Sequence, residues 1–76
     1  MQAAAALDRA VELAEEHGSA LIEAESRGTR ARMHAARQEW GQVRRDVERA
    51  LVLYRRLGAD RDREALERWL GEVLPN

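Results

Sequence analysis

Apolar side chains recur at steps of three and four residues along most of the chain, which is the spacing of one face of an α-helix. The pattern is strong in three segments, whereas in the second of four it narrows to a stripe of mostly small residues. Gly18 and Gly58 follow two of these segments and suit the left-handed position at which helices end. The pattern predicts a single domain (1–76) of four helices, over about 2–17, 19–38, 41–57 and 61–74.

Four polar or small residues bear on how these helices begin and pack. Ser19 is expected to cap the second helix, and Asp60 or Asp62 the fourth, because such side chains accept hydrogen bonds from free backbone N–H groups. Gly28 lies inside the second helix, where glycine is unfavourable. It therefore indicates either a close crossing with a neighbouring helix or a kink.

Composition supports an all-α fold stabilised by packing alone. Of the 34 apolar residues 14 are Ala, whereas Val, Ile and Thr together number 7, which favours helix over sheet. The chain has no Cys, so disulfides and thiolate metal sites are excluded. We expect antiparallel helices in a solenoid-like row.

The chain resembles itself at an offset of 40 residues. Leu7-Asp8-Arg9-Ala10-Val11-Glu12-Leu13 aligns with Val47-Glu48-Arg49-Ala50-Leu51-Val52-Leu53, and Gly18 aligns with Gly58. Helix pairs that repeat at periods of roughly 20 to 50 residues are typical of solenoids.

These repeats resemble the tetratricopeptide repeat (TPR) family, in its longer variant common in bacterial regulators. The resemblance lies in Trp40-Gly41-Gln42-Val43, Val47-Glu48-Arg49-Ala50-Leu51, Tyr54 and Leu70-Gly71. The second helix departs from the family pattern, since Arg27 stands where a large apolar residue is usual and Arg30-Ala31 where Leu-Gly is usual. We expect this helix to be shifted in register or exposed.

The resemblance implies a non-catalytic module for protein interaction or self-assembly. Family members bind ligands in a groove along the first helix of each repeat, and Arg32 would pair there with a partner carboxylate. The corresponding groove residues here are Glu25, Arg32, Ala35, Ala36, Arg68 and Glu72.

Stacked repeats cover their apolar faces with neighbours, and a chain of this length leaves two faces open. Self-association would cover them, so we expect a homo-oligomer. The residues assigned to this contact are Ala3, Leu7, Val11, Trp69 and Val73. A monomeric helix bundle is the alternative.

Candidate chemistry is sparse. His17 and His34 are the two histidines, and no Ser or Cys stands in a nucleophile motif. We expect no catalytic residue, no metal and no cofactor.

Charge is unevenly distributed along the chain. Residues 1–25 carry a net charge of −5, residues 26–56 one of +6, and the rest one of −2. Pairing between adjacent helices is one interpretation of this pattern and a partner-binding surface is another. Nucleic-acid binding through the Arg-rich middle is a weaker third, because the acidic flanks would repel phosphate.

The sequence shows no signal peptide or membrane-spanning run, which favours a cytoplasmic protein. An alternative is a small oligomeric bundle, excised or engineered from a larger regulator, such as a transcriptional one, with no independent activity.

Overall fold

The computed structural model describes residues 2–74, which form four helices and no strand. The helices are α1 (Gln2–His17), α2 (Ala20–Ala36), α3 (Trp40–Leu57) and α4 (Asp60–Val73). The prediction of an all-helical chain is confirmed, and each helix boundary lies within two residues of the predicted one. None of these helices is both long and apolar enough to cross a membrane.

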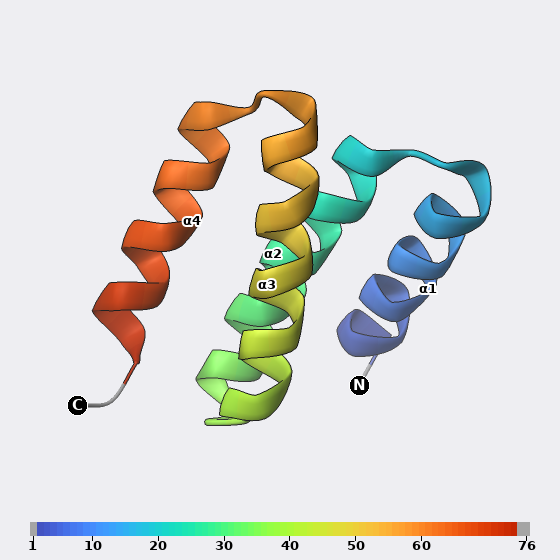
Figure 1. Cartoon of the computed structure of the whole chain (residues 1–76). Helices are drawn as coiled ribbons and strands as arrows, with labels where there is room; N and C mark the ends of the chain where they lie inside the picture. Colours follow the sequence, from blue (N-terminus) through green and yellow to red (C-terminus); the bar gives the residue numbers. More distant parts are fainter. Residues whose placement is uncertain (1, 75–76) are drawn as a thin grey trace.

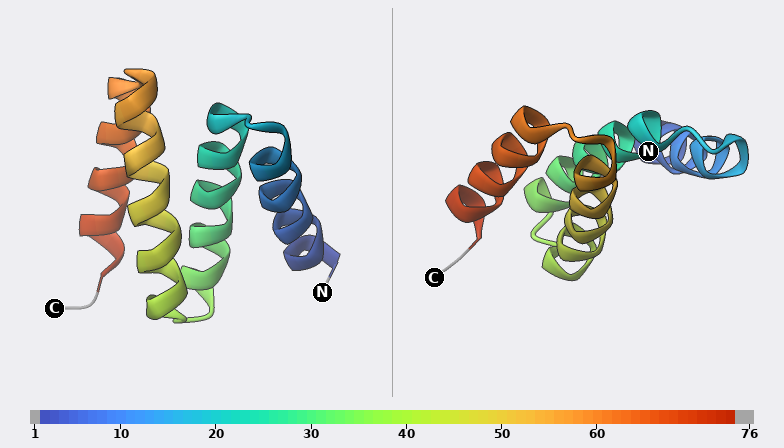
Figure 2. Two further views of the ribbon diagram at one scale, coloured as in Figure 1. Left: turned by 45° about the vertical axis from the view of Figure 1, so that its right-hand side comes forward. Right: turned by 45° about the horizontal axis from the view of Figure 1, so that its top comes forward.

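The helices pack in the order of the sequence. α2 and α3 share the largest interface, α1 packs against α2, and α4 packs against α3. Successive helices run in alternating directions (Figures 1 and 2). The chain measures 37 × 31 × 15 Å, and its smallest dimension is close to the diameter of one helix, about 10–12 Å. The helices therefore form little more than a single layer.

All three connections use the same backbone turn. Gly18, Gln38 and Gly58 adopt left-handed φ angles of 67°, 59° and 68°. In each turn this residue donates its N–H to the carbonyl three residues earlier, and the next residue donates to the carbonyl five residues earlier. This is the Schellman arrangement. Because the turns are 20 residues apart, each helix and its turn form one 20-residue unit, half of the offset seen in the sequence.

The expected helix caps are only partly correct. Ser19 occupies the N-cap position of α2, but its side chain makes no capping hydrogen bond. Ala59 occupies that position for α4, so the assignment to Asp60 or Asp62 is wrong. Both carboxylates lie in the first turn of α4, where they still interact favourably with the helix dipole.

The core lies between α2 and α3 and receives one fully packed side chain from α4. Its largest completely buried side chains are Val43 and Val47, so the core is thin. α1 buries Val11 and Ala14 separately from this cluster. The cluster consists of Ala24, Ala31, Val43, Val47, Ala50, Leu53, Tyr54 and Leu66.

Gly28 is buried but does not mark a close helix crossing. A Cβ atom added there would meet only the guanidinium of Arg32, at an ordinary contact distance of 3.7 Å. The expected crossing is therefore wrong, and α2 continues through this position without a break.

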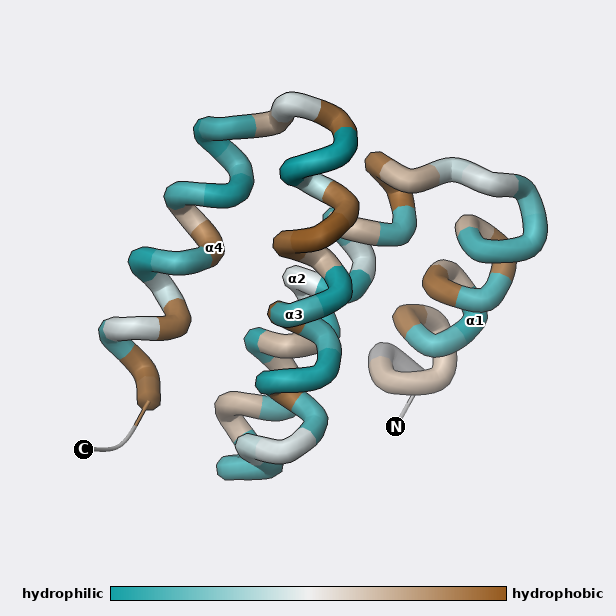
Figure 3. The backbone as a smooth tube through the Cα atoms, viewed as in Figure 1, coloured by the Kyte–Doolittle hydropathy of each residue, from teal (hydrophilic) through white to brown (hydrophobic). Residues whose placement is uncertain are grey.

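Apolar segments alternate with hydrophilic ones along α1 and α3, as expected of amphipathic helices (Figure 3). Four large apolar residues are nevertheless exposed within the described part of the chain: Leu13, Leu21, Ile22 and Leu57.

Candidate functional site

Asp46 is the centre of a buried group of charges between α2 and α3. The residue is 2% exposed, and its carboxylate accepts two hydrogen bonds from Arg30, at 2.9 Å from Nε and 2.7 Å from Nη2. Arg27 donates a third hydrogen bond at 3.2 Å. Such charge-assisted, two-pronged contacts fix both distance and orientation. They set the register between α2 and α3.

Glu23 extends this group along α2 and is 4% exposed. It accepts hydrogen bonds from Arg27 at 2.7 Å and from Arg49 of α3 at 3.3 Å. Two acids of α1 join from the other side: Asp8 lies 2.9 Å from Arg30, and Glu15 lies 3.5 Å from Arg27. The charges therefore connect three helices.

This arrangement explains the unusual pattern of the second helix. Arg27 and Arg30 stand where the family resemblance led us to expect apolar residues, and both pair with buried acids of α2 and α3. The expectation that α2 is exposed is therefore wrong. The hydrogen bond to Asp46 raises the pKa of Arg30 further above its ordinary value, in opposition to burial. No buried side-chain N or O atom in the described residues lacks a hydrogen-bond partner.

His34 contacts the edge of the same group. Its Nδ1 lies 2.8 Å from Oε1 of Glu39, and its Nε2 lies 3.9 Å from Oδ2 of Asp46. Glu39 belongs to the turn at Gln38, so this contact joins the turn to the helix that precedes it.

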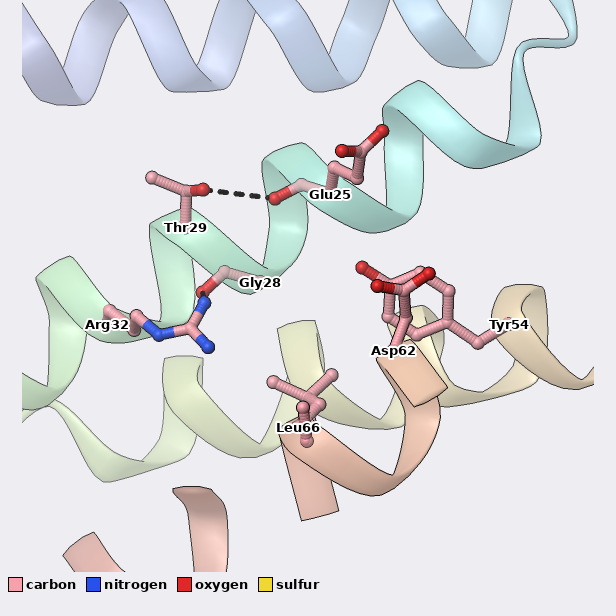
Figure 4. Close-up of a pocket in the computed structure, with 8 residues that line it drawn as sticks. Glu25, Gly28, Thr29, Arg32, Tyr54, Asp62 and Leu66 are labelled. Carbon is pink, nitrogen blue, oxygen red and sulfur yellow. Dashed lines mark hydrogen bonds between the residues drawn. The ribbon is translucent and has the colours of Figure 1, made fainter. Parts of the chain in front are cut away.

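A groove opens where α2, α3 and α4 meet. Its volume is about 210 Å³, and charged, hydroxyl and apolar groups line it. Figure 4 shows side chains from the three helices around it. The lining residues are Glu25, Gly28, Thr29, Arg32, Tyr54, Asp62, Ala65 and Leu66.

Tyr54 forms one end of this groove. The residue is only 6% exposed because its ring belongs to the core. Asp62 of α4 and Glu25 of α2 line the same groove (Figure 4). Burial raises the pKa of Tyr54, and the negative charges of Asp62 and Glu25 raise it further, while Arg32 lowers it.

Arg32 forms the other end. Its guanidinium carbon lies 5.2 Å from the ring centroid of Trp69 on α4, a distance at which a cation and an aromatic ring attract each other. Its Nη1 donates to the carbonyl of Gly28 at 3.4 Å. Arg32 therefore spans the gap between α2 and α4.

The structure brings together only two of the predicted groove residues, Glu25 and Arg32. Ala35 packs against the core, whereas Ala36, Arg68 and Glu72 are exposed on α2 and α4 and do not line the groove. Sequence reasoning missed Tyr54 and Asp62 as groove residues. The periodicity of α3 indicated only a core position for the first, and the acidic start of α4 indicated only a capping role for the second.

The residues assigned to self-association are not all accessible. Val11 is 3% exposed and packs within the chain, so it offers almost no surface to a second copy in this structure. Leu7, Trp69 and Val73 are half-buried. The side chain of Ala3 is not among those that the structure describes.

A more exposed apolar surface lies between α1 and α2. Leu13, Leu21 and Ile22 are 36%, 48% and 55% exposed. The first and last of these help to line an apolar hollow of about 350 Å³, together with Ala10, Ala14, His17 and Ser19.

Within residues 2–74, no three or more His, Asp or Glu side chains come together in a way that could hold a metal ion. Comparison of the chain with protein family models, with curated proteins and with solved structures finds no match.

Proposed function

We propose that this chain is a non-catalytic protein-interaction module, a TPR-like antiparallel array of helices that binds a peptide segment of a partner. One observation carries the proposal: the groove where α2, α3 and α4 meet is open and combines charged, hydroxyl and apolar groups from three helices. Binding sites typically combine apolar walls with a few polar groups in this way.

The repeated 20-residue unit supports this proposal. Identical turns place successive helices side by side, as in helical repeat proteins, which present extended binding surfaces. Thr29 and Tyr54 supply hydroxyl groups to the groove, and Glu25 and Asp62 supply carboxylates, all of which can pair with polar groups of a peptide.

Selection from a library of linear peptides would test the proposal. Selected peptides, titrated into ¹⁵N-labelled protein, should shift the amide resonances of residues in the groove. Peptides that shift only residues of α1, or selection that yields no peptide, would contradict it.

Two matched variants locate the binding surface. Ala65→Phe should weaken binding because the ring fills the groove, whereas Ala36→Phe adds the same ring to an exposed position of α2 outside it. The opposite result would favour the register implied by the family resemblance, in which Ala36 faces the ligand.

Self-association is a second candidate function, favoured by the exposed apolar surface between α1 and α2. A second copy of the chain would bury this surface by a contact about a twofold axis. Light scattering should then give a mass above that of one chain, and Ile22→Glu should return it to one. Leu57→Glu, at a similarly exposed leucine of α3, should leave the mass unchanged. A mass of one chain at every concentration would exclude self-association.

The arginine-rich middle gains no support as a nucleic-acid surface. Arg27, Arg30 and Arg49 pair with buried carboxylates, which removes them from any basic face.

A further inference from the structure

We propose that the end of the groove formed by Glu25, Tyr54 and Asp62 binds one positively charged side chain, arginine or lysine, of a partner peptide. This inference rests on the proposed function and names the chemistry that the groove recognises.

Two acidic residues on opposite helices help to line this end of the groove. Glu25 belongs to α2 and Asp62 to α4, and both are exposed (Figure 4). Neither takes part in any of the salt bridges found among the described residues, although twelve such contacts connect other side chains. Both are therefore free to pair with a cation from outside the chain.

Tyr54 supplies an independent observation. The residue is 94% buried, as its exposed fraction of 6% implies, yet its hydroxyl forms none of the hydrogen bonds found between described side chains. Every buried side-chain N or O atom in the described residues has a hydrogen-bond partner, so a hydroxyl without one must be accessible to solvent. It therefore reaches the open groove, where it can accept a hydrogen bond from a ligand N–H group.

The charge of the groove matches a single positive charge. The two carboxylates and Arg32 are its only charged lining groups, which leaves a net charge of −1. The guanidinium of Arg32 lies at the opposite end and disfavours a second cation there. A volume of about 210 Å³ accommodates a guanidinium or ammonium group with part of its side chain. The planar guanidinium presents its N–H donors in a fixed fork, so it can pair with a carboxylate through two hydrogen bonds at once.

Two blocked peptides test this inference. Acetyl-Ala-Ala-Arg-Ala-Ala-amide should shift the amide resonances of Glu25, Tyr54 and Asp62 in a saturable way. The peptide with citrulline, which is neutral and almost the same shape as arginine, should bind at least about tenfold more weakly, because a charge-assisted hydrogen bond is stronger than a neutral one. Equal binding of the two peptides would overturn the inference, and so would absence of binding by the arginine peptide.

Paired variants show whether these carboxylates are responsible. Glu25→Gln with Asp62→Asn should weaken binding of the arginine peptide by about tenfold or more. Glu16→Gln with Glu48→Gln changes the net charge equally at exposed positions outside the groove and should leave binding unchanged. Equal weakening by both pairs would show only a general charge effect and would overturn the inference.

The source of the cation is tested in the same spectra. Shifts of the groove resonances on dilution of the protein alone would show that a second copy supplies the arginine, which would overturn the assignment to a partner. Library peptides that bind the groove without Arg or Lys would overturn this inference while the proposed function stands. If no peptide binds the groove, both fail.

Discussion

Gln38 adopts the left-handed conformation that glycine adopts in the two equivalent turns. This conformation costs a residue with a Cβ atom roughly 1–2 kcal/mol, because the Cβ approaches the following carbonyl. The Schellman hydrogen bonds at Gln38 match those at Gly18 and Gly58, so the turn forms in the same way despite the side chain of Gln38.

Gln38→Gly should therefore increase the free energy of unfolding by about 0.5–1 kcal/mol, after allowance for the greater freedom of glycine in the unfolded chain. Urea denaturation followed by circular dichroism would measure this change. Gln42→Gly, the same substitution at an exposed position of α3, should instead lower stability by up to about 1 kcal/mol. Equal loss in both variants would contradict this account of the turn.

Asp46 has a structural role that surface acids do not share. Removal of its charge leaves Arg30 without a buried carboxylate partner and leaves Arg27 with only that of Glu23. Loss of one partner of a buried pair costs about 3–5 kcal/mol. Asp46→Asn should lower the free energy of unfolding by about 3 kcal/mol, the low end of this range, because both arginines retain some access to water.

The control is Glu67→Gln, which breaks the well-formed but exposed contact with Arg63. Exposed pairs contribute about 0–1 kcal/mol, so this variant should melt almost as the original chain does. Similar losses at the two positions would show that the interior group has no special importance.

Tyr54 gives the protein a defined dependence on alkaline pH. Burial and neighbouring carboxylates raise its pKa, so in the range above about pH 10 the unfolded chain loses the phenolic proton before the folded chain does. Stability should be unaffected by this group below about pH 10 and should fall as the pH rises through the folded pKa.

Absorbance of tyrosinate measures this directly, because Tyr54 is the only tyrosine and the chain has neither Lys nor Cys to titrate nearby. Its midpoint should lie above that of the unfolded chain in urea and should decrease in Glu25→Gln with Asp62→Asn. Equal midpoints in folded and unfolded protein would contradict the assignment.

At the scale of helices, apolar periodicity was enough to predict α1, α3 and α4, because each of them has an amphipathic pattern. It was insufficient for α2, whose contact with α3 depends on Arg27, Arg30 and the buried Asp46 as much as on apolar packing. α2 ends at Ala36, two residues before the predicted end at residue 38. The left-handed turn at Gln38 could not be predicted, because glutamine, unlike glycine, does not indicate one.

The groove could be predicted only in part for a related reason. Glu25 and Arg32 were assigned from a family resemblance, whereas Tyr54 and Asp62 join them only when α3 and α4 converge on α2. An amphipathic side chain such as tyrosine can pack its ring in the core and present its hydroxyl elsewhere. The spacing of apolar residues in a sequence indicates only that the ring is buried, and not where the hydroxyl lies.

α4 is the helix most weakly attached to the described part of the fold. It contributes one core residue, Leu66, with Trp69 and Leu70 partly buried beside it. Amide hydrogen exchange should therefore be faster in α4 than in α3, because elements with few buried contacts open more readily.

Leu66→Ala should lower the free energy of unfolding by about 2–4 kcal/mol and remove most exchange protection from α4. Leu57→Ala, at a leucine that is 46% exposed, should have a much smaller effect. Uniform exchange across all four helices would show that α4 does not open separately.

At the scale of the whole molecule, the row of helices leaves most side chains close to one of two broad surfaces. Only small side chains are completely enclosed, and the exposed Leu13, Leu21 and Ile22 are gathered near one end of the row. Partner binding and self-association would use different parts of this surface, because the groove lies among α2, α3 and α4 and the apolar hollow between α1 and α2.

The packing of each helix against its neighbours in sequence also bears on how the chain reaches this structure. Residues that meet in the fold are separated by short stretches of chain, so little entropy is lost in closing each loop. Such local topologies fold within microseconds to milliseconds. Stopped-flow or temperature-jump fluorescence of Trp40 and Trp69 should detect refolding on this timescale, and a phase lasting seconds would indicate a slower step such as assembly of several chains.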